Sequence, residues 1–309
     1  MRYTLKRRVL GAPDFIEISH DDFNQWKSVQ RNLIAAFNIE QTFDLLLENY
    51  AEFARDCLDL SLRASLFSKD EETLRPYREV NRRLMNLLSS GRLYTSQVPR
   101  ELNSFHRGRS PHTDKFKRVF LNKAEKSFGY CVMEALRNHS QHFGFPVHAL
   151  SVQYKREDVT PGSPLSVGLR LFLEVGRLQQ DGKFSPEILA DLTAKANRDG
   201  IFDLTPLVPE YVEKLCEVHE SLRGLISTDI ASWDETILSV LDRARGTFGE
   251  DLSGLAVVVE EKDEEDDYYL DVEWADIFGE PIDWRKQLEA KNRDFSNLAA
   301  RYVTWPANS

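Results

Sequence analysis

The sequence predicts an α+β protein, in which a helical N-terminal region precedes a smaller mixed region with antiparallel strands. Two observations lead to this fold class. Between about residues 20 and 145, apolar side chains recur at three- and four-residue steps, the period of helices that face a core. From residue 147 onward, short alternating and β-branched runs occur in pairs separated by turn-rich or acidic stretches. We therefore expect a helical domain over residues 1–145 and an acidic α+β domain over residues 146–309.

The N-terminal elements are expected in the following order. Residues 15–18 have strand character, and a helical pattern follows over 22–67, with a division into two helices near Asn38. Residues 68–70 are typical of a helix cap. The helix that they begin is expected to end at Gly91, because glycine commonly terminates helices.

A long basic loop and a third helix complete the predicted helical domain. Residues 91–113 are rich in turn formers, and long loops inside compact domains are often functional. Thr113 is expected to cap a helix that stops near Phe143, since Gly144 and Pro146 follow.

The C-terminal domain is expected to contain two strand pairs and several helices. Turn-rich residues separate the first strand pair, and an acidic turn separates the second. The predicted strands are 147–154, 167–175, 255–260 and 268–273, and the predicted helices are 186–197, 208–227, 233–245 and 284–302.

Charge is distributed unevenly along the chain. The formal net charge is −10, yet the segment from Arg75 to Lys126 holds 13 basic and four acidic residues, a net charge of +9. The remainder carries a net charge of −19. Such a split predicts a local face that binds a polyanion. The alternative is a solvated helical surface that happens to be basic.

Several classes of function and location are disfavoured. Cys57, Cys131 and Cys216 are odd in number and far apart, which excludes a disulfide framework and a CxxC metal knuckle. No apolar run approaches the roughly 20 residues that span a bilayer, and no secretory signal is recognisable, so we expect a cytoplasmic protein without a membrane partner. Phosphate-binding glycine motifs and the GxSxG motif are absent from the sequence.

The residues with the clearest chemical potential lie near the end of the third predicted helix. Arg137 can hold a phosphate through two hydrogen bonds, and His142 can move a proton near neutral pH. Residues five apart on a helix are separated by about 140° around its axis, so these two converge only if the helix loosens or a second copy completes the site. A metal site that uses His139, His142 and His148 is a further alternative.

The order Arg137-Asn138-x3-His142, within a helical domain, resembles the signature of the HEPN superfamily, and especially of its members in prokaryotic toxin and antiphage defence systems. The N-terminal helices would then form a HEPN-like bundle. Members that are paired with a nucleotidyltransferase antitoxin carry a tyrosine two residues after the histidine, where this chain has Gly144. Regulation through such a tyrosine is therefore not expected.

This resemblance implies a homodimeric endoribonuclease that needs no metal or other cofactor. Catalysis would fall to Arg137, Asn138 and His142, with His139 as a substrate contact. The resemblance also suggests a partner protein, either an antitoxin or another component of a defence system. The alternative function is a catalytically inactive HEPN-like dimerisation module that docks RNA or such a partner. The basic residues that we expect to bind RNA are Arg82, Arg83, Arg107 and Arg109.

Overall fold

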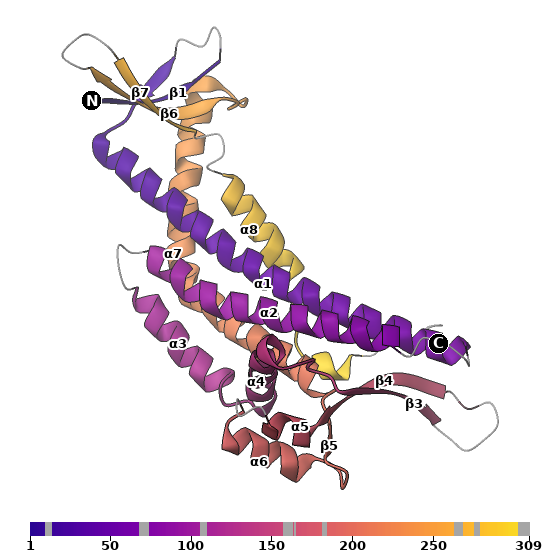
Figure 1. The fold of residues 1–309 in the computed structure, drawn as a ribbon. Coiled ribbons are helices and arrows are strands. Elements are labelled where there is room, and N and C mark those ends of the chain that lie inside the picture. The colour runs from indigo at the N-terminus through magenta and orange to yellow at the C-terminus, as the bar shows by residue number, and fades with distance from the viewer. Residues whose placement is uncertain are drawn as a thin grey trace. The chain divides into compact units, whose positions relative to one another are not determined.

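A computed structural model of the chain confirms the α+β class (Figure 1). It describes residues 1–9, 14–67, 74–105, 110–156, 163, 165–180, 184–262, 268–274 and 279–301. The strands are β1 (Arg2–Arg7), β2 (Phe15–Glu17), β3 (Ala149–Arg156), β4 (Leu165–Glu174), β5 (Ile201–Asp203), β6 (Leu255–Lys262) and β7 (Tyr268–Trp274). The helices are α1 (His20–Leu66), α2 (Leu74–Ser104), α3 (Pro111–Lys123), α4 (Phe128–His142), α5 (Val175–Gln180), α6 (Pro186–Lys195), α7 (Leu207–Phe248), α8 (Glu280–Lys291) and the 3₁₀ helix η1 (Leu298–Ala300). Among the described helices, none is long and apolar enough to cross a membrane.

The chain folds into two compact units, each assembled from three segments. The first unit comprises Met1–Gln41, Val98–Asp114 and Arg223–Arg293, and the second comprises Thr42–Gln97, Lys115–Leu222 and Asp294–Ser309. Each unit combines residues from before and after residue 145. The boundaries of the two units therefore differ from the domain boundary that we expected at residue 145.

The first unit contains a four-stranded antiparallel sheet in the order β2-β1-β6-β7. Leu5 of β1 pairs with Val257 of β6, and both side chains are buried in the core of this unit. Trp26 of α1 and Leu241 of α7 belong to the same core. The predicted strand pair near the C-terminus is therefore present, but it is joined by β1, a strand that the sequence patterns did not indicate.

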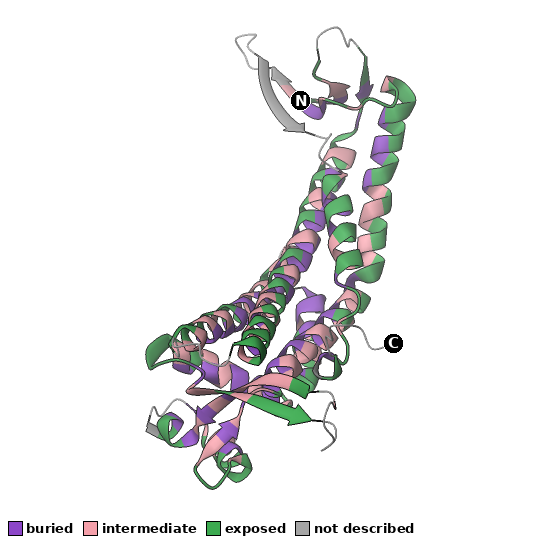
Figure 2. Ribbon diagram, turned by 90° about the vertical axis from the view of Figure 1, so that its right-hand side faces the viewer, coloured by how far each residue is buried: buried purple, intermediate pink, exposed green. Residues whose placement is uncertain are grey.

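The second unit contains a three-stranded antiparallel sheet in the order β3-β4-β5. The β3–β4 hairpin corresponds to the predicted pair of strands at 147–154 and 167–175. Its helices carry buried side chains on one side and exposed ones on the other (Figure 2). Leu46, Leu84, Leu136 and Leu215, from four different helices, are fully shielded from solvent.

Two helices that we expected to be divided are continuous. Helix α1 runs through Asn38 because the neighbouring Ala36 and Ile39 are buried and continue the apolar stripe. Helix α7 likewise joins the two helices predicted at 208–227 and 233–245, and buried Ile226 and Ile237 lie on either side of the expected break. Burial of these apolar side chains in the tertiary structure outweighs the weak local preference of the intervening residues for a helix break.

The predicted helix end at Gly91 and the loop that follows it are wrong, since α2 continues to Ser104. The glycine serves a close tertiary contact instead. A Cβ atom at Gly91 would lie 2.1 Å from the hydroxyl oxygen of Tyr211, whose side chain is completely buried. The caps expected at residues 68–70 and the part of the loop at 106–109 fall outside the described residues.

The expected third helix is instead two helices, α3 and α4, separated at residues 124–127. Ser127 has an extended backbone and its hydroxyl accepts a hydrogen bond from the amide of Tyr130, which makes it the N-cap of α4. The last predicted helix, 284–302, also differs: α8 ends at Lys291, and the short η1 follows separately.

Substitution of Gly91 by alanine should destabilise the protein although alanine is the better helix former. The added methyl group collides with buried Tyr211, and overpacking of this kind costs about 1–3 kcal/mol. Gly224→Ala is the matched control, because this helical glycine has open space around it, and the change should stabilise the protein by up to about 1 kcal/mol. Urea unfolding followed by circular dichroism measures both variants. Equal effects of the two substitutions would contradict the close contact.

Candidate functional site

Helix α4 carries the predicted motif, and its first turn is held by a carboxylate from α7. Glu210 accepts hydrogen bonds from the hydroxyl of Ser127 at 2.6 Å and from the amide of Gly129 at 3.1 Å. A Cβ atom at Gly129 would lie 2.5 Å from the carboxyl carbon of Glu210, so a glycine is needed for this approach. A negative charge at a helix N-terminus also interacts favourably with the helix dipole. The start of α4 is therefore fixed by two hydrogen-bond acceptors, the hydroxyl of Ser127 and the carboxylate of Glu210.

The four motif residues occupy the last turns of α4 and differ in exposure. Arg137 is half-buried, Asn138 and His142 are exposed, and His139 is only 4% exposed. The guanidinium of Arg137 donates a hydrogen bond from Nη1 to the side-chain oxygen of Asn138 at 2.9 Å. These contacts join Arg137 to Asn138 but not to His142.

The helix stays regular up to His142, and Phe143 forms its C-cap. Loosening of the helix before His142, one of the two ways in which the motif could converge, is therefore wrong. At 100° per residue, Arg137 and His142 point about 140° apart. A single α4 does not bring these two side chains to one face.

A partly buried carboxylate that the sequence patterns did not single out lies one helical turn before Arg137. Glu134 accepts a hydrogen bond from the hydroxyl of Tyr211 at 3.1 Å. Burial raises the pKa of Glu134, while the hydrogen bond from Tyr211 and the charges of Arg92 and Arg137 act in the opposite direction. Burial, and then the charge of Glu134, also raises the pKa of Tyr211.

The inner part of the Arg137 side chain is shielded from solvent. Its Nε is buried and donates no hydrogen bond to any residue that the structure describes. The charge of Arg137 acts to lower the pKa of Glu134, and Arg137 Nη1 reaches Asn138 on the exposed side. The available sequence signal was the three-residue spacing of Glu134 and Arg137, which places them on one side of a helix.

A buried asparagine fixes the chain where it leaves α4. Asn81 of α2 is fully buried, accepts a hydrogen bond from the amide of Val147 at 2.9 Å and donates one to its carbonyl at 3.2 Å. It also donates to the carbonyl of Tyr77 at 3.0 Å. A polar side chain on the buried face of α2, between Val80 and Leu84, is the only hint of this role in the sequence.

Aromatic rings surround His139. Its ring centroid lies 6.0 Å from that of Phe143, with nearly parallel planes, and 6.1 Å from those of Phe184 and His148. The predicted substrate contact is thus packed against protein rather than presented to solvent. Phe143 and Phe145, which follow the motif, are about half exposed, at 49% and 47%.

The predicted RNA-binding residues fall into three groups. Arg82 is exposed on α2. Arg83 forms ion pairs with Glu52 and Asp56, and its hydrogen bond to Asp56 raises its pKa. Its charge is therefore compensated within the protein. Arg107 and Arg109 lie outside the described residues.

Arg82 belongs to a row of exposed arginines on one face of α2. Within the second unit they fall inside an arc of about 100°, opposite the buried face that contains Leu84 and Leu87. We call this row the arginine stripe; its members are Arg75, Arg78, Arg82 and Arg92.

The alternative of a metal site finds no ligand cluster. In the described part of the chain, no three histidine, cysteine, aspartate or glutamate side chains are grouped so that they could hold a metal ion. The cysteines also lack the features of a nucleophile, since burial raises the pKa of Cys57 to about 12 and raises that of Cys131.

No family model, curated protein sequence or solved structure matches this chain.

Proposed function

We propose that this chain is a HEPN-like endoribonuclease, and that its site forms where the α4 helices of two copies meet. The observation that carries the proposal is the motif geometry: exposed Asn138 and His142 share one side of the helix end, and Arg137 is tethered to Asn138 but points away from His142. A second copy supplies the partner that each half of the motif lacks. By its resemblance, such a ribonuclease acts in the cytoplasm as a toxin or an antiphage defence enzyme.

The proposed chemistry uses the nucleophile that RNA itself provides. His142 removes the proton from a ribose 2′-OH, whose oxygen attacks the adjacent phosphorus, and the imidazolium that forms returns this proton to the departing 5′-oxygen. Arg137 stabilises the negative charge that develops on the phosphoryl oxygens. The products are a 2′,3′-cyclic phosphate and a 5′-hydroxyl, and the proton balance closes without a metal.

The surroundings of Arg137 support its role. A guanidinium is most useful in catalysis when it is already oriented before the substrate arrives. The hydrogen bond to Asn138 holds one side of the Arg137 head group, and the partly buried Glu134 interacts with it electrostatically. Lysine has no equivalent planar group, so it would not reproduce this arrangement.

The arginine stripe supports RNA as the substrate. Arg78, Arg82 and Arg92 present their charges to solvent along a single face of α2. Such a row can follow a phosphate backbone without reading its sequence. Arg83 does not belong to this row, since Glu52 and Asp56 compensate its charge.

The alternative is a non-catalytic dimerisation module that docks RNA or a defence partner. It is favoured by the separation of Arg137 and His142 within one α4, because an isolated copy then has no assembled catalytic pair. The two functions differ in whether bound RNA is cut.

RNA cleavage by the purified protein should survive excess EDTA, leave a 2′,3′-cyclic phosphate and fail on substrates that lack the 2′-OH. His142→Ala should lower the rate by about 10²–10⁴ through loss of the proton transfer. Arg137→Lys should be nearly as inactive as Arg137→Ala. His20→Ala, which removes an exposed histidine of α1, is the control and should keep full activity. Gel analysis of end-labelled RNA measures all of these.

Cleavage that requires an added divalent metal, or equal cleavage of DNA, would refute the proposed chemistry. RNA that is bound but never cut, with binding unaffected by His142→Ala, would establish the docking module in its place.

The arginine stripe should determine RNA affinity. Arg78→Glu with Arg82→Glu should weaken binding and reduce the slope of log affinity against log salt, by about 0.7 for each phosphate contact that a single strand loses. Arg198→Glu removes an equally exposed arginine outside the stripe and should change neither quantity. Fluorescence anisotropy at several salt concentrations measures both effects. Equal losses in the two proteins would show that RNA follows a different surface.

A further inference from the structure

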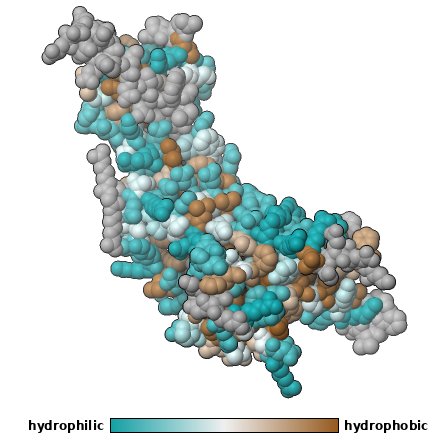
Figure 3. All heavy atoms as spheres, in the orientation of Figure 1, coloured by the Kyte–Doolittle hydropathy of each residue, from teal (hydrophilic) through white to brown (hydrophobic). Residues whose placement is uncertain are grey.

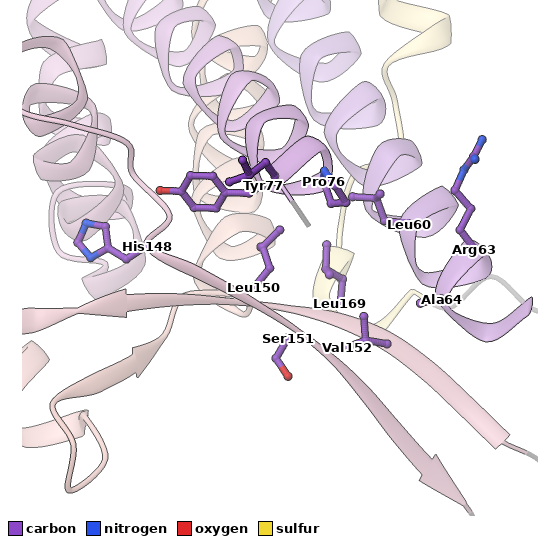
Figure 4. A pocket seen from close by; sticks show the side chains of 11 residues that line it. Leu60, Arg63, Ala64, Pro76, Tyr77, His148, Leu150, Ser151, Val152 and Leu169 are labelled. Carbon is purple, nitrogen blue, oxygen red and sulfur yellow. The ribbon is translucent and has the colours of Figure 1, made fainter. Parts of the chain in front are cut away.

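A groove in the second unit has no part in the proposed catalysis. It lies between the last turns of α1, the first turn of α2 and the β3–β4 hairpin, and its volume is about 530 Å³ (Figure 4). Pockets for small molecules typically measure about 300–1,000 Å³. The groove is therefore large enough for a small ligand.

The walls of the groove are aliphatic. Leu150 and Val152 point into it from β3, whereas Ser151 between them points away, as alternation along a strand requires (Figure 4). Apolar side chains from both walls face one another, and no acidic side chain is found among the described residues that line it. The aliphatic members of the lining are Leu60, Ala64, Leu74, Leu150, Val152 and Leu169. Beside these strands, apolar side chains are exposed among hydrophilic ones (Figure 3).

One end of the groove is cationic. Arg63 lines this end and directs its guanidinium outward, where Nε donates to Asp59 at 2.7 Å (Figure 4). The hydroxyl of Tyr154 donates to the carbonyl of Ala64 at 2.9 Å, which joins β3 to the last turns of α1. Lys155 and Arg156 follow Tyr154 and are exposed. Lys155 lies on the opposite face of β3 by strand alternation, and Arg156 donates to the carbonyl of Ser163 at 3.3 Å, so Arg63 is the cationic side chain that lines this end.

The other end is uncharged and polar. The ring of Tyr77 extends toward His148, which also lines the groove (Figure 4). His148 accepts a hydrogen bond at Nδ1 from the amide of Glu174 at 2.9 Å, so its side chain is held in place. The groove thus runs from a cationic mouth, along aliphatic walls, to a polar inner end.

We propose that this groove binds the anion of a medium-chain fatty acid. The hydrocarbon chain lies between the aliphatic walls, where its transfer from water is favourable, and the carboxylate remains at the Arg63 end. A nucleobase fits this lining less well, because the walls are aliphatic and the rings of Tyr77 and His148 lie together at the inner end. The proposal goes beyond the ribonuclease activity and does not depend on it.

Titration calorimetry of the full-length protein with dodecanoate, below its micellar concentration, tests the proposal. Binding should be saturable, with one site per chain. Val152→Trp fills the groove and should abolish it. Arg63→Glu reverses the charge at the mouth, leaves the walls intact and should weaken affinity several-fold. Leu62→Trp is the control, since Leu62 is exposed on α1 and does not line the groove, and it should bind as the wild type does.

Several outcomes would overturn the proposal. Unchanged binding in Val152→Trp would place the ligand elsewhere. Because the larger side chain could disturb folding, Arg63→Glu gives an independent reading: equal affinity of this variant and of the wild type would remove the carboxylate contact. If dodecanol bound as tightly as dodecanoate, the carboxylate contact would likewise be excluded. Binding to phosphatidylglycerol vesicles without binding of free dodecanoate would identify a membrane surface instead, and displacement of dodecanoate by AMP would identify a nucleotide site.

Discussion

The proposed site depends on the phase of one helix. Glu210 and Ser127 fix the first turn of α4, and regular helical geometry then determines the direction of every later side chain. Because α4 stays regular to its end, Arg137 and His142 point to different sides. A catalytic pair between these two residues therefore requires the motif of another molecule. The dimer in the proposed function is inferred from this helical geometry.

The same unit brings α2, α4 and α7 together through a buried polar contact. Tyr211 of α7 packs against the backbone at Gly91 of α2 and donates its hydroxyl proton to Glu134 of α4. Burial of a carboxylate is costly unless hydrogen bonds and opposite charges compensate for it. Here Tyr211, Arg92 and Arg137 provide that compensation. The contact consequently stabilises the packing of three helices.

The sequence predicted those features that depend on local patterns. The β3–β4 hairpin and the β6–β7 pair were recognisable from alternating residues and turn formers. Features that depend on distant residues were not. Gly91 has the local character of a helix end, but it lies inside α2 because Tyr211 requires space there. The pairing of β1 with β6 joins segments that are far apart in the chain and leaves no local signal.

In the candidate site, too, some features had a local sequence signal and others depended on distant residues. The order of Arg137, Asn138 and His142 was visible in the sequence, as was the basic segment that contains the arginine stripe. The distribution of roles within that segment was not, since only the fold shows that Arg83 is compensated by Glu52 and Asp56. Asn81 was also missed, because its partner Val147 is distant in the sequence.

Subunit mixing tests the shared site most directly. Arg137→Ala and His142→Ala proteins, each inactive alone, are mixed under conditions that exchange subunits, and RNA cleavage is measured. A mixed dimer contains one site in which Arg137 of one copy faces His142 of the other, so cleavage should return. If the mixture remains inactive while wild-type subunits that undergo the same exchange stay active, the two residues do not act across a dimer interface.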